Sequence, residues 1–441
     1  MKRKNAGKKG RFNICVIGAG YVGLVVASCF AKLKNKVICV DSNQEKVKLL
    51  KQSKIPNFEP GLPAIIRDAV KKKRLSFTTS ISEAVKKSDI IFIAVGTPPR
   101  KDGEADLSAV ENVARTIAQS LDSYKLIVEK STVPVQTGIE IKKTILRYTS
   151  KRNKDFDVAS NPEFLREGKA IDDFLYPDRI VIGVETKRAE KILKKLYEPI
   201  KAPVLVTDIN TAEIIKHASN SFLATKISFI NAVARVCEEA GADVRKVAEG
   251  IGMDARIGRR FLDAGIGFGG SCFPKDVEAF IGISKKLGYR FNLLEEVKNI
   301  NISQRRHLVS KIKEELWIIK DKNIAVLGVS FKPDTDDVRE SPSIDIINYL
   351  LEEGAKVRVS DPKALSKASE LLKGAHFCKD PYIAVKNADC LILATEWKEF
   401  AELDFRRIKR LMRYPFIADG RNFLDRDKLR RAGFKYIGIG R

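Results

Sequence analysis

The feature that most constrains the fold is a glycine-rich turn near the N-terminus, within the segment FNICVIGAGYVGLVVASCFAK. Gly18, Gly20 and Gly23 directly follow an apolar strand-like run and open an apolar helix-like run. At this spacing the first glycine permits a tight turn, the second lets the backbone approach a pyrophosphate, and the third lets the helix pack closely on the strand. The helix N-terminus then faces the anion. The turn therefore predicts a parallel α/β sheet that binds a dinucleotide.

An acidic residue about twenty residues further along the chain strengthens this prediction. Asp41 ends a second strand-like run, 36–41, where a carboxylate binds the adenosine ribose hydroxyls of a dinucleotide. Ser42, Asn43 and Gln44 follow, with no arginine among them for a 2′-phosphate, so NAD⁺ is favoured over NADP⁺. The alternative is an ordinary glycine turn and a surface aspartate, and the strand and helix that flank the turn argue against it.

Strand-like and helix-like runs alternate over the first half of the chain. Strands are expected at 12–18, 36–41, 90–97, 126–133, 157–163, 179–184 and 204–208. A long helical pattern runs from Asn210 to about Glu249, and Gly241 ends its first helix. Near Asp321 the alternation resumes, with strands at 323–329, 356–360, 390–395 and 416–418. We therefore expect the α/β class, with two Rossmann-like doubly wound parallel-sheet domains joined by a helical connector that contains one long central helix.

The charge of the chain bears on its partners. Its formal net charge of +25 raises the question of nucleic-acid binding. The lysines are dispersed, however, and runs such as 71–74 are too short to form an extended basic stripe. A basic surface that attracts small anionic substrates fits this pattern better, so a nucleic-acid partner is not expected.

The location and the metal content follow from simple absences in the sequence. No apolar run reaches the roughly eighteen residues of a membrane helix, and the basic N-terminus lacks the apolar segment of a secretory signal. We therefore expect a cytoplasmic protein without a membrane partner. The seven cysteines include no C-x-x-C pair and there are only three histidines, so neither disulfides nor a metal is expected.

Cys272 differs from the other cysteines because it lies in a glycine-rich segment, GIGFGGSCFPKD. Small neighbours let a substrate approach its sulfur, and Lys275 or another lysine could favour the thiolate, which is a nucleophile. A structural loop cysteine is the alternative, and local chemistry alone leaves both open. Burial should make inert the cysteines of strand-like and helical runs, namely Cys15, Cys29, Cys39, Cys237 and Cys390.

The long helix carries a second indication of catalysis. Residues placed at 100° steps form an apolar stripe of Ala212, Ile215, Leu223, Ile227, Ile230 and Ala234. Lys216 and Asn220 fall inside that stripe at i and i+4, so their side chains should emerge together. An ammonium and an amide aimed at one point would stabilise an alkoxide or oxyanion, whereas a lysine that merely extends to solvent is the alternative. His217 is expected in packing or at the surface.

Six motifs occur in one order: GAGYVG at 18–23, STV at 131–133, NPEFL at 161–165, the Lys216 and Asn220 helix, GFGGSCFPKD at 267–276, and FKPD at 331–334. Together they resemble the UDP-glucose/GDP-mannose dehydrogenase family, from about Phe12 to the C-terminus. The resemblance implies a basic leader at 1–11, an NAD-binding Rossmann domain at 12–208, a central helical dimerisation and catalytic region at 209–320, and a Rossmann-like domain that binds the UDP-sugar at 321–441.

The resemblance also implies two successive oxidations of a sugar C6 alcohol that consume two NAD⁺. Cys272 would trap the intermediate aldehyde as a thiohemiacetal, the second oxidation would give a thioester, and water would release the uronate. Lys216 and Asn220 would bind the C6 oxygen and stabilise its negative charge.

Further roles are implied for residues around this centre. Asp276 would assist proton transfer, Thr132 would position the water, and Glu163 would be the general base of thioester hydrolysis. A carboxylate that stabilises the start of a helix is the alternative for Glu163. The implied cofactor-binding residues are Gly18, Gly20, Tyr21, Val22, Gly23, Asp41, Thr97, Thr132 and Arg339. The implied substrate-binding residues are Glu163, Phe164, Leu165, Lys216, Asn220, Arg256, Phe268, Gly269, Lys332 and Arg421.

The resemblance leaves alternatives for partner and substrate. Arg256 is similar to an arginine that reaches a neighbouring subunit, which would require a homodimer or a higher homo-oligomer. The stretch 177–183 favours the UDP-glucose branch over the UDP-N-acetylmannosamine and GDP-mannose branches. A two-electron hydroxyacid dehydrogenase is the rival from another reaction class, but it needs neither a nucleophilic cysteine nor the region after Asp321.

Overall fold

The computed structural model describes residues 12–56, 58–98, 100, 105–150 and 155–441. The basic leader, 1–11, lies outside these ranges. The chain divides into two compact units, Met1–Ala218 and Ser219–Arg441. The boundary falls within one 32-residue helix, α9 (Ile209–Ala240), so this helix contributes residues to both units.

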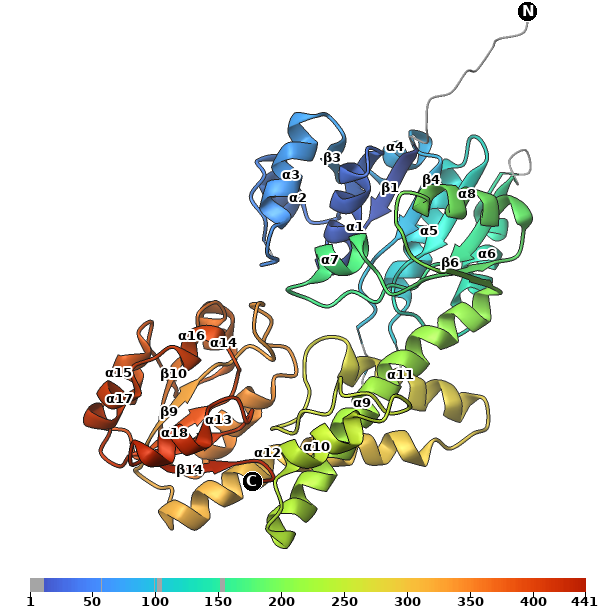
Figure 1. Cartoon of the computed structure of the whole chain (residues 1–441). Coiled ribbons are helices and arrows are strands. Elements are labelled where there is room, and N and C mark those ends of the chain that lie inside the picture. Colours follow the sequence, from blue (N-terminus) through green and yellow to red (C-terminus); the bar gives the residue numbers. More distant parts are fainter. Residues whose placement is uncertain (1–11, 57, 99, 101–104, 151–154) are drawn as a thin grey trace, which may run out of the picture. The chain divides into compact units, whose positions relative to one another are not determined.

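The first unit is a sheet with helices on both faces (Figure 1). Its strands lie in the order β3-β2-β1-β4-β5-β6-β7-β8, and every neighbouring pair is parallel except β6 and β7. In chain order the elements are β1 (Asn13–Ile17), α1 (Tyr21–Lys32), β2 (Lys36–Val40), α2 (Gln44–Lys51), α3 (Leu62–Lys71), β3 (Leu75–Thr78), α4 (Ile81–Lys86), β4 (Ile90–Ile93), α5 (Ser108–Ser120), β5 (Lys125–Glu129), α6 (Thr137–Tyr148), β6 (Phe156–Ser160), α7 (Ala170–Leu175), β7 (Ile180–Val184), α8 (Lys187–Tyr197) and β8 (Val204–Thr207).

Alternation of side chains along β1 explains why this sheet is covered twice. Ile14 and Val16 are buried in one apolar cluster, whereas Cys15 and Ile17 are buried in a second. Successive side chains of a strand point to opposite faces, so the two clusters are the cores on the two sides of the sheet. A central strand that is apolar at four successive positions, 14–17, therefore needs helices on both faces of the sheet.

The second unit contains helices and a smaller parallel sheet. Its six strands lie in the order β11-β10-β9-β12-β13-β14, which repeats the order of the first six strands of the other sheet. In chain order the elements after α9 are α10 (Val244–Gly252), α11 (Phe273–Lys286), α12 (Asn292–Leu316), β9 (Asn323–Leu327), α13 (Pro342–Glu352), β10 (Lys356–Ser360), α14 (Leu365–Leu371), β11 (His376–Phe377), α15 (Pro381–Val385), β12 (Cys390–Leu393), α16 (Lys398–Ala401), α17 (Phe405–Leu411), β13 (Phe416–Asp419), α18 (Arg426–Arg431) and β14 (Lys435–Gly438).

The expected fold class is confirmed: two parallel-sheet α/β units are present, with one long central helix. Every expected strand is found, but three short strands were not predicted, namely β3, β11 and β14. Several expected strands were also too long at their carboxyl ends. The runs 90–97, 126–133 and 157–163 leave the sheet after Ile93, Glu129 and Ser160, because each chain turns into a loop there.

The stripe expected on α9 is only partly correct. Ala212, Ile230 and Ala234 are buried together with Lys216 and Asn220. The expected members Ile215, Leu223 and Ile227 are only half-buried. The helix ends at Ala240, and Gly241 follows with a positive φ of 67°, as predicted.

No helix within the described ranges is long and apolar enough to cross a membrane. Among the same residues, no group of three or more His, Cys, Asp and Glu side chains is placed to hold a metal ion.

Candidate active site

The glycine turn of the first unit has the shape of a pyrophosphate site. The helix α1 begins at Tyr21 with Gly20 as its N-cap, and a Cβ at Gly20 would meet no atom within 4 Å. Gly23 has no such space, because its Cβ would lie 1.9 Å from the carbonyl oxygen of Gly18. The helix therefore packs directly on the turn, and open space lies before the backbone of Gly20. Tyr21 and Val22 are half-buried in the first turn of this helix.

Asp41 lies at the carboxyl end of β2, beside this turn. Its Oδ2 accepts a hydrogen bond from the backbone N–H of Ala19 at 2.9 Å, and its Oδ1 accepts one from Asn43 at 3.0 Å. The Nζ of Lys46 lies 3.0 Å from Oδ2. Burial alone would raise the pKa of Asp41, but the donors Asn43, Lys46 and Ala19 outweigh it and lower that pKa. Asp41 is therefore an ionised acceptor. Sequence analysis did not identify Lys46 as a residue of this site.

Two threonines lie on loops at the carboxyl end of the same sheet. Thr97 follows β4 and is buried, and its hydroxyl donates a hydrogen bond to the carbonyl oxygen of Thr132 at 2.8 Å. Thr132 follows β5 and is half-buried. The edge of a parallel sheet at which helices begin is the usual place for ligands in such folds.

Glu163 and Lys216 form a buried ion pair in the first unit. The Nζ of Lys216 lies 3.1 Å from Oε1 of Glu163, and both side chains are about 5% exposed. Oε2 of Glu163 accepts a hydrogen bond from the backbone N–H of Leu165. The Nζ of Lys216 also lies 5.5 Å from the centre of the Phe164 ring. Glu163 is thus held by a side chain from α9, and the alternative of a simple helix-start carboxylate does not describe its contacts.

One partner of this region was missed by sequence analysis. Lys130 directly follows β5 and is buried, and its Nζ donates a hydrogen bond to Oδ1 of Asn161 at 3.0 Å. The only sequence signal was its position next to the STV motif. His217, which was expected in packing or at the surface, is buried, and its Nε2 lies 2.7 Å from the carbonyl oxygen of Val133.

Cys272, Asn220 and Asp276 belong to the second unit. Cys272 is the N-cap of the 14-residue helix α11, and its side chain is half-buried. The positive end of a helix favours an anion at that position, so this location favours the thiolate. Four residues on, Asp276 is buried and its Oδ2 accepts a hydrogen bond from Nδ2 of Asn220 at 2.6 Å. The Nζ of Lys275 lies 2.8 Å from Oδ1 of Asp276.

The remaining cysteines are buried, as expected for the five that sequence analysis assigned to strands and helices. Burial raises the pKa of the thiols of Cys29 and Cys39 to about 12. Thiols that stay protonated are poor nucleophiles. Cys272 is therefore the cysteine whose environment suits chemistry.

The glycine-rich loop before Cys272 is fixed within the second unit. Phe268 is buried, and its backbone N–H and carbonyl bond to the amide of Asn301 at 2.8 and 3.0 Å. A Cβ on Gly269 would lie 2.2 Å from the carbonyl oxygen of Glu340. The small residues of this loop thus pack against the backbone of the C-terminal sheet region, and they do not merely leave room for a substrate.

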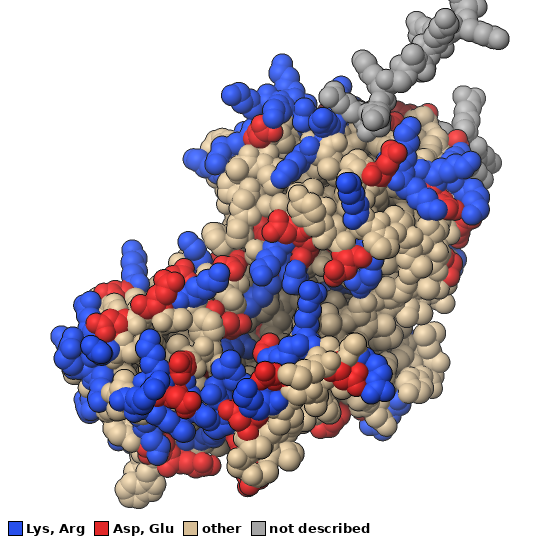
Figure 2. Space-filling view, in the orientation of Figure 1, with Lys and Arg blue, Asp and Glu red and all other residues tan. Residues whose placement is uncertain are grey.

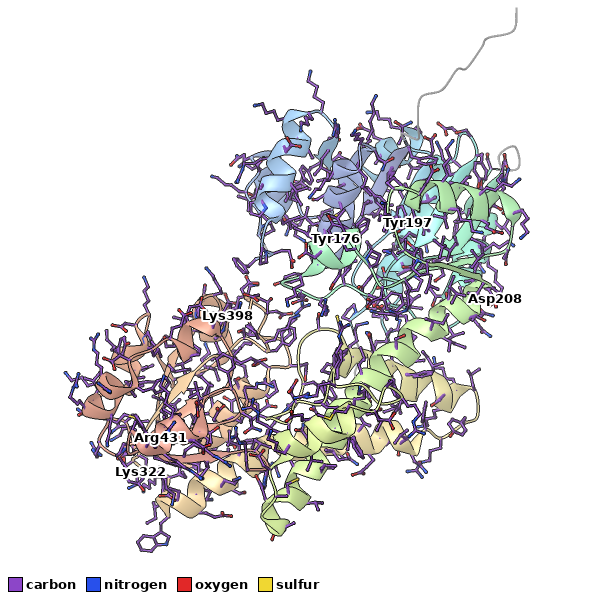
Figure 3. The ribbon with its side chains drawn as sticks, viewed as in Figure 1. Tyr176, Tyr197, Asp208, Lys322, Lys398 and Arg431 are labelled. Carbon is purple, nitrogen blue, oxygen red and sulfur yellow. The ribbon has the colours of Figure 1, made fainter. Side chains whose placement is uncertain are left out.

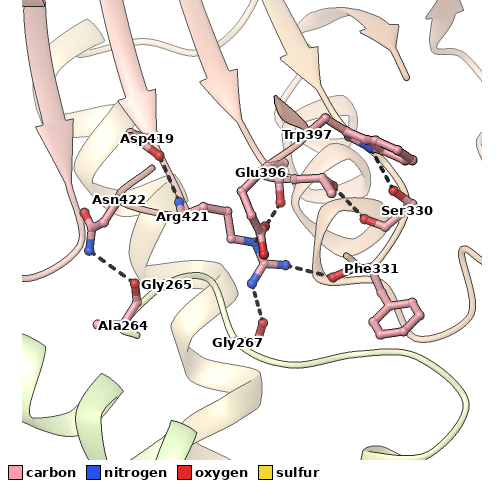
Figure 4. A network of polar contacts seen from close by, with 12 residues as sticks. Ala264, Gly265, Gly267, Ser330, Phe331, Glu396, Trp397, Asp419, Arg421 and Asn422 are labelled. Carbon is pink, nitrogen blue, oxygen red and sulfur yellow. Dashed lines mark hydrogen bonds and ion pairs between the residues drawn. The ribbon is translucent and has the colours of Figure 1, made fainter. Parts of the chain in front are cut away.

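Arg421 fastens the same loop to the C-terminal sheet (Figure 4). Its Nε donates to the carbonyl of Ala394 at 2.9 Å, its Nη1 to Gly267 at 2.9 Å, and its Nη2 to Phe331 at 3.2 Å. Glu396 lies 3.4 Å from Nε. Burial lowers the pKa of Arg421, and Glu396 opposes this. Three of the five guanidinium N–H groups thereby donate hydrogen bonds within the protein. Two N–H groups remain for the expected contact with the sugar.

Three further expected residues lie on the second unit. Lys332 is half-buried, with its Nζ 5.3 Å from the centre of the Phe331 ring. Arg339 is half exposed and forms a forked pair with Asp337. Arg256 forms a similar pair with Asp254, and its side chain is 89% exposed. An exposed arginine with this geometry is available to another molecule.

Lysine and arginine side chains cover much of the face drawn in Figure 2, and acidic side chains lie between them in both units. This distribution agrees with the dispersed lysines of the sequence.

Comparison with known proteins adds to this geometry. Models of the UDP-glucose/GDP-mannose dehydrogenase family match the chain in three parts: the NAD binding domain at residues 12–201, the central domain at 210–303 and the UDP binding domain at 325–426. These matches together span most of the described chain.

Relatives and solved structures resemble the chain over nearly its whole length. It is 48% identical to the UDP-glucose 6-dehydrogenase TuaD of Bacillus subtilis, over 97% of this chain and 93% of the relative. It is 46% identical to a UDP-glucose 6-dehydrogenase of Rhizobium meliloti, over 97% of this chain and 99% of the relative. The structure of a UDP-glucose dehydrogenase from Pyrobaculum islandicum matches with a TM-score of 0.92 and 39% identity, over 100% of this chain and 99% of the other.

Proposed function

The chain belongs to the UDP-glucose/GDP-mannose dehydrogenase family, and we propose that it oxidises UDP-glucose at C6 to UDP-glucuronate with two NAD⁺ per sugar. The observation that carries the proposal is Cys272 at the N-terminus of α11, with the buried Asn220–Asp276 pair on the same unit. The full-length similarity to UDP-glucose 6-dehydrogenases supports UDP-glucose over other nucleotide sugars.

The proposed division of labour follows the family's parts. Residues 12–208 would bind NAD, 209–320 would form the central catalytic and dimerisation region, and 321–441 would bind the UDP-sugar. The residues of the first unit fit NAD, because open space lies before the backbone of Gly20 and Asp41 is an ionised acceptor for ribose hydroxyls. Thr97, Thr132 and Arg339 would add contacts to it. When bound, NAD⁺ supplies the hydride acceptor for each oxidation.

Cys272 makes the second oxidation feasible. An aldehyde carries no hydride whose removal yields an acid until a nucleophile has added to its carbonyl. The thiolate adds to the C6 aldehyde and forms a thiohemiacetal, whose oxidation gives a thioester on Cys272. The helix α11 favours the thiolate before this addition and again when it leaves.

Lys216 and Asn220 are proposed to stabilise negative charge on the C6 oxygen. They lie one turn apart on α9 and both are buried, so the charge and the amide dipole act in a medium of low dielectric. Asp276 accepts the hydrogen bond of Asn220 at 2.6 Å and thereby orients its amide. Its carboxylate would also accept a proton as the alcohol is oxidised.

Glu163 is proposed to act last, in the hydrolysis of the thioester. Its carboxylate would take a proton from a water that Thr132 positions, as that water attacks the thioester carbonyl. Phe164 and Leu165 follow it directly and would contact the substrate, as would Phe268, Gly269, Lys332 and Arg421 of the second unit.

A homodimer is proposed as the functional assembly. Phe222, Phe229 and Val236 repeat every seven residues on α9 and are 65%, 54% and 67% exposed. Apolar side chains on one exposed helix face favour burial in an interface. Arg256 would then reach the partner's site. Light scattering of Phe229→Glu tests this proposal: the variant should be a monomer, and an unchanged mass would contradict it.

The location proposed is the cytoplasm, because no disulfide joins the cysteines of the described residues, which suits a reducing compartment.

The covalent step can be tested directly. Glu163→Gln should slow hydrolysis, so acid quenching with UDP-glucose and NAD⁺ should trap an acyl adduct on the Cys272 peptide, which mass spectrometry detects. The double variant with Cys272→Ala should show none. Cys237→Ala, which removes a buried thiol of α9, is the matched control and should turn over as the wild type does. An adduct on another cysteine would refute the assignment of Cys272.

A further inference from the structure

Lys130 is a buried cation for which the mechanism above has no use. It is the first residue after β5, and only 5% of its surface is exposed. Its Nζ donates a hydrogen bond to Oδ1 of Asn161 at 3.0 Å, so its direct partner is a neutral amide. Burial of an ammonium is unfavourable unless nearby groups stabilise its charge. The burial of the Lys130 ammonium therefore needs an explanation.

Asn161 begins the turn that carries Glu163, and it is held from three sides. Its Oδ1 also accepts a hydrogen bond from the hydroxyl of Tyr197 at 2.5 Å. Tyr197 is the last residue of α8 and is labelled in Figure 3. Its Nδ2 donates to the carbonyl oxygen of Val181 on β7 at 2.7 Å. Its backbone N–H bonds to the carbonyl of Glu129 at 2.9 Å. Lys130 is thus part of the framework that fixes the backbone two residues before Glu163.

The charges around Glu163 are also unequal. Lys216 of α9 pairs directly with it, and Lys130 interacts with both from the end of β5. Burial lowers the pKa of the Lys130 ammonium to about 7, the Glu163 carboxylate opposes that fall, and the Lys216 ammonium reinforces it. Tyr197 is the other titratable group of this cluster, and burial raises its pKa, so it stays neutral. Two lysine side chains and one carboxylate therefore interact in this buried cluster.

We propose that Lys130 is a positioning residue that holds the Glu163 turn in place for hydrolysis of the thioester. The inference rests on the proposed function, because it assigns Lys130 to one step of that reaction. In this step Glu163 accepts a proton from water, the water oxygen bonds to the thioester carbonyl carbon, the C–S bond breaks, and the sulfur of Cys272 leaves with the bonding electron pair. The step requires the Glu163 carboxylate to be held in one position, which the turn after Asn161 determines.

Lys130→Met tests the proposal because it keeps the length of the side chain and removes the charge. The variant should still fold, since Oδ1 of Asn161 retains the hydroxyl of Tyr197. We expect kcat to fall on the order of tenfold, because the turn that carries Glu163 loses one of its supports and the carboxylate is less well placed. KM for UDP-glucose should not change.

A burst measurement identifies the step that is affected. Both oxidations precede hydrolysis, so mixing the variant with UDP-glucose and NAD⁺ should release two NADH per site rapidly and further NADH slowly. Lys125→Met is the matched control: Lys125 is the first residue of β5, is 3% exposed, and donates to the carbonyl of Ser88 at 2.8 Å. This control should keep the wild-type kcat and show no burst.

Asn161→Asp is a second variant in case the first does not fold. It keeps an acceptor for Lys130 but removes the Nδ2 donor to the carbonyl oxygen of Val181, so it loosens the same turn and should give the same burst. An unchanged kcat without a burst in the folded variants, beside a wild type that forms two NADH per sugar, would overturn the role of Lys130 alone. A wild type that forms no NADH from UDP-glucose would overturn the proposed function, and this inference with it.

Discussion

Arg421→Met should destabilise the second unit and weaken substrate binding together. The guanidinium supplies hydrogen bonds to three backbone carbonyls, at 2.9, 2.9 and 3.2 Å, from segments that are far apart in sequence. A hydrogen bond from a charged donor contributes about 1.5 kcal/mol or more, and removal of one partner leaves the other buried without it. Three such losses amount to about 4.5 kcal/mol, and removal of a buried cation offsets part of this, so we expect about 3 kcal/mol.

Urea unfolding followed by intrinsic fluorescence measures this change. With a slope of about 3 kcal/mol per molar, the midpoint of the second unit's transition should fall by about 1 M. Arg407→Met is the matched control, because Arg407 is exposed and lies 4.1 Å over the ring of Tyr382. That change should cost less than about 1 kcal/mol. An Arg421→Met protein with an unchanged midpoint would refute the idea that Arg421 fastens the loop before Cys272, and an unchanged KM for UDP-glucose would refute its contact with the sugar.

Three further predictions concern the cofactor site and the half-buried carboxylate of Glu238. Gly23→Ala should abolish NAD⁺ binding and lower the melting temperature of the first unit, since its Cβ would meet the carbonyl of Gly18 at 1.9 Å. Gly20→Ala has open space for its Cβ, so it should keep the wild-type melting temperature and lose only NAD⁺ affinity. Equal melting temperatures for the two variants would contradict this. Asp41→Asn should weaken NAD⁺ binding on the order of tenfold in a fluorescence titration, because a neutral acceptor replaces a charged one for the ribose hydroxyls; unaltered affinity would count against that contact. Burial raises the pKa of Glu238, but hydrogen bonds from His307 and Lys311 outweigh it and lower it to about 2. A lowered folded-state pKa means that its stabilisation is present above the unfolded value near 4.5 and is lost as pH falls from there toward 2. Glu238→Gln should therefore melt below the wild type at pH 7, and the gap should narrow below pH 4.5; a gap that is constant with pH would disprove the linkage.

Much of the fold could be predicted from the sequence because its strongest signals are local. The glycine turn, Asp41 and the apolar runs each act within a few residues, and they lie where expected. The strands β3, β11 and β14 were missed because they are short strands near the sheet edges, of two to four residues, with little apolar sequence. The expected strands ran too far into loops because buried loops and buried strands have similar composition.

The candidate site was predicted in its parts but not in its pairings. Lys216 and Asn220 are buried on one helix, as periodicity indicated. Their partners, Glu163 and Asp276, lie 53 and 56 residues away along the chain. A local sequence pattern cannot predict contacts between residues so far apart. Lys130 and Lys46 were overlooked for the same reason, since a single lysine in a chain rich in lysine carries no signal until its neighbours are known. Phe222 and Phe229 point outward on α9, although simple periodicity assigns bulky apolar residues to a core.

The central claim is a four-electron oxidation, and the number of NADH formed per UDP-glucose tests it most directly. A limiting, known amount of UDP-glucose would be incubated with the purified chain and excess NAD⁺ until absorbance at the NADH band stops rising. The account predicts two NADH for each sugar. One NADH per sugar would contradict the thioester route through Cys272, and none would contradict UDP-glucose as the substrate.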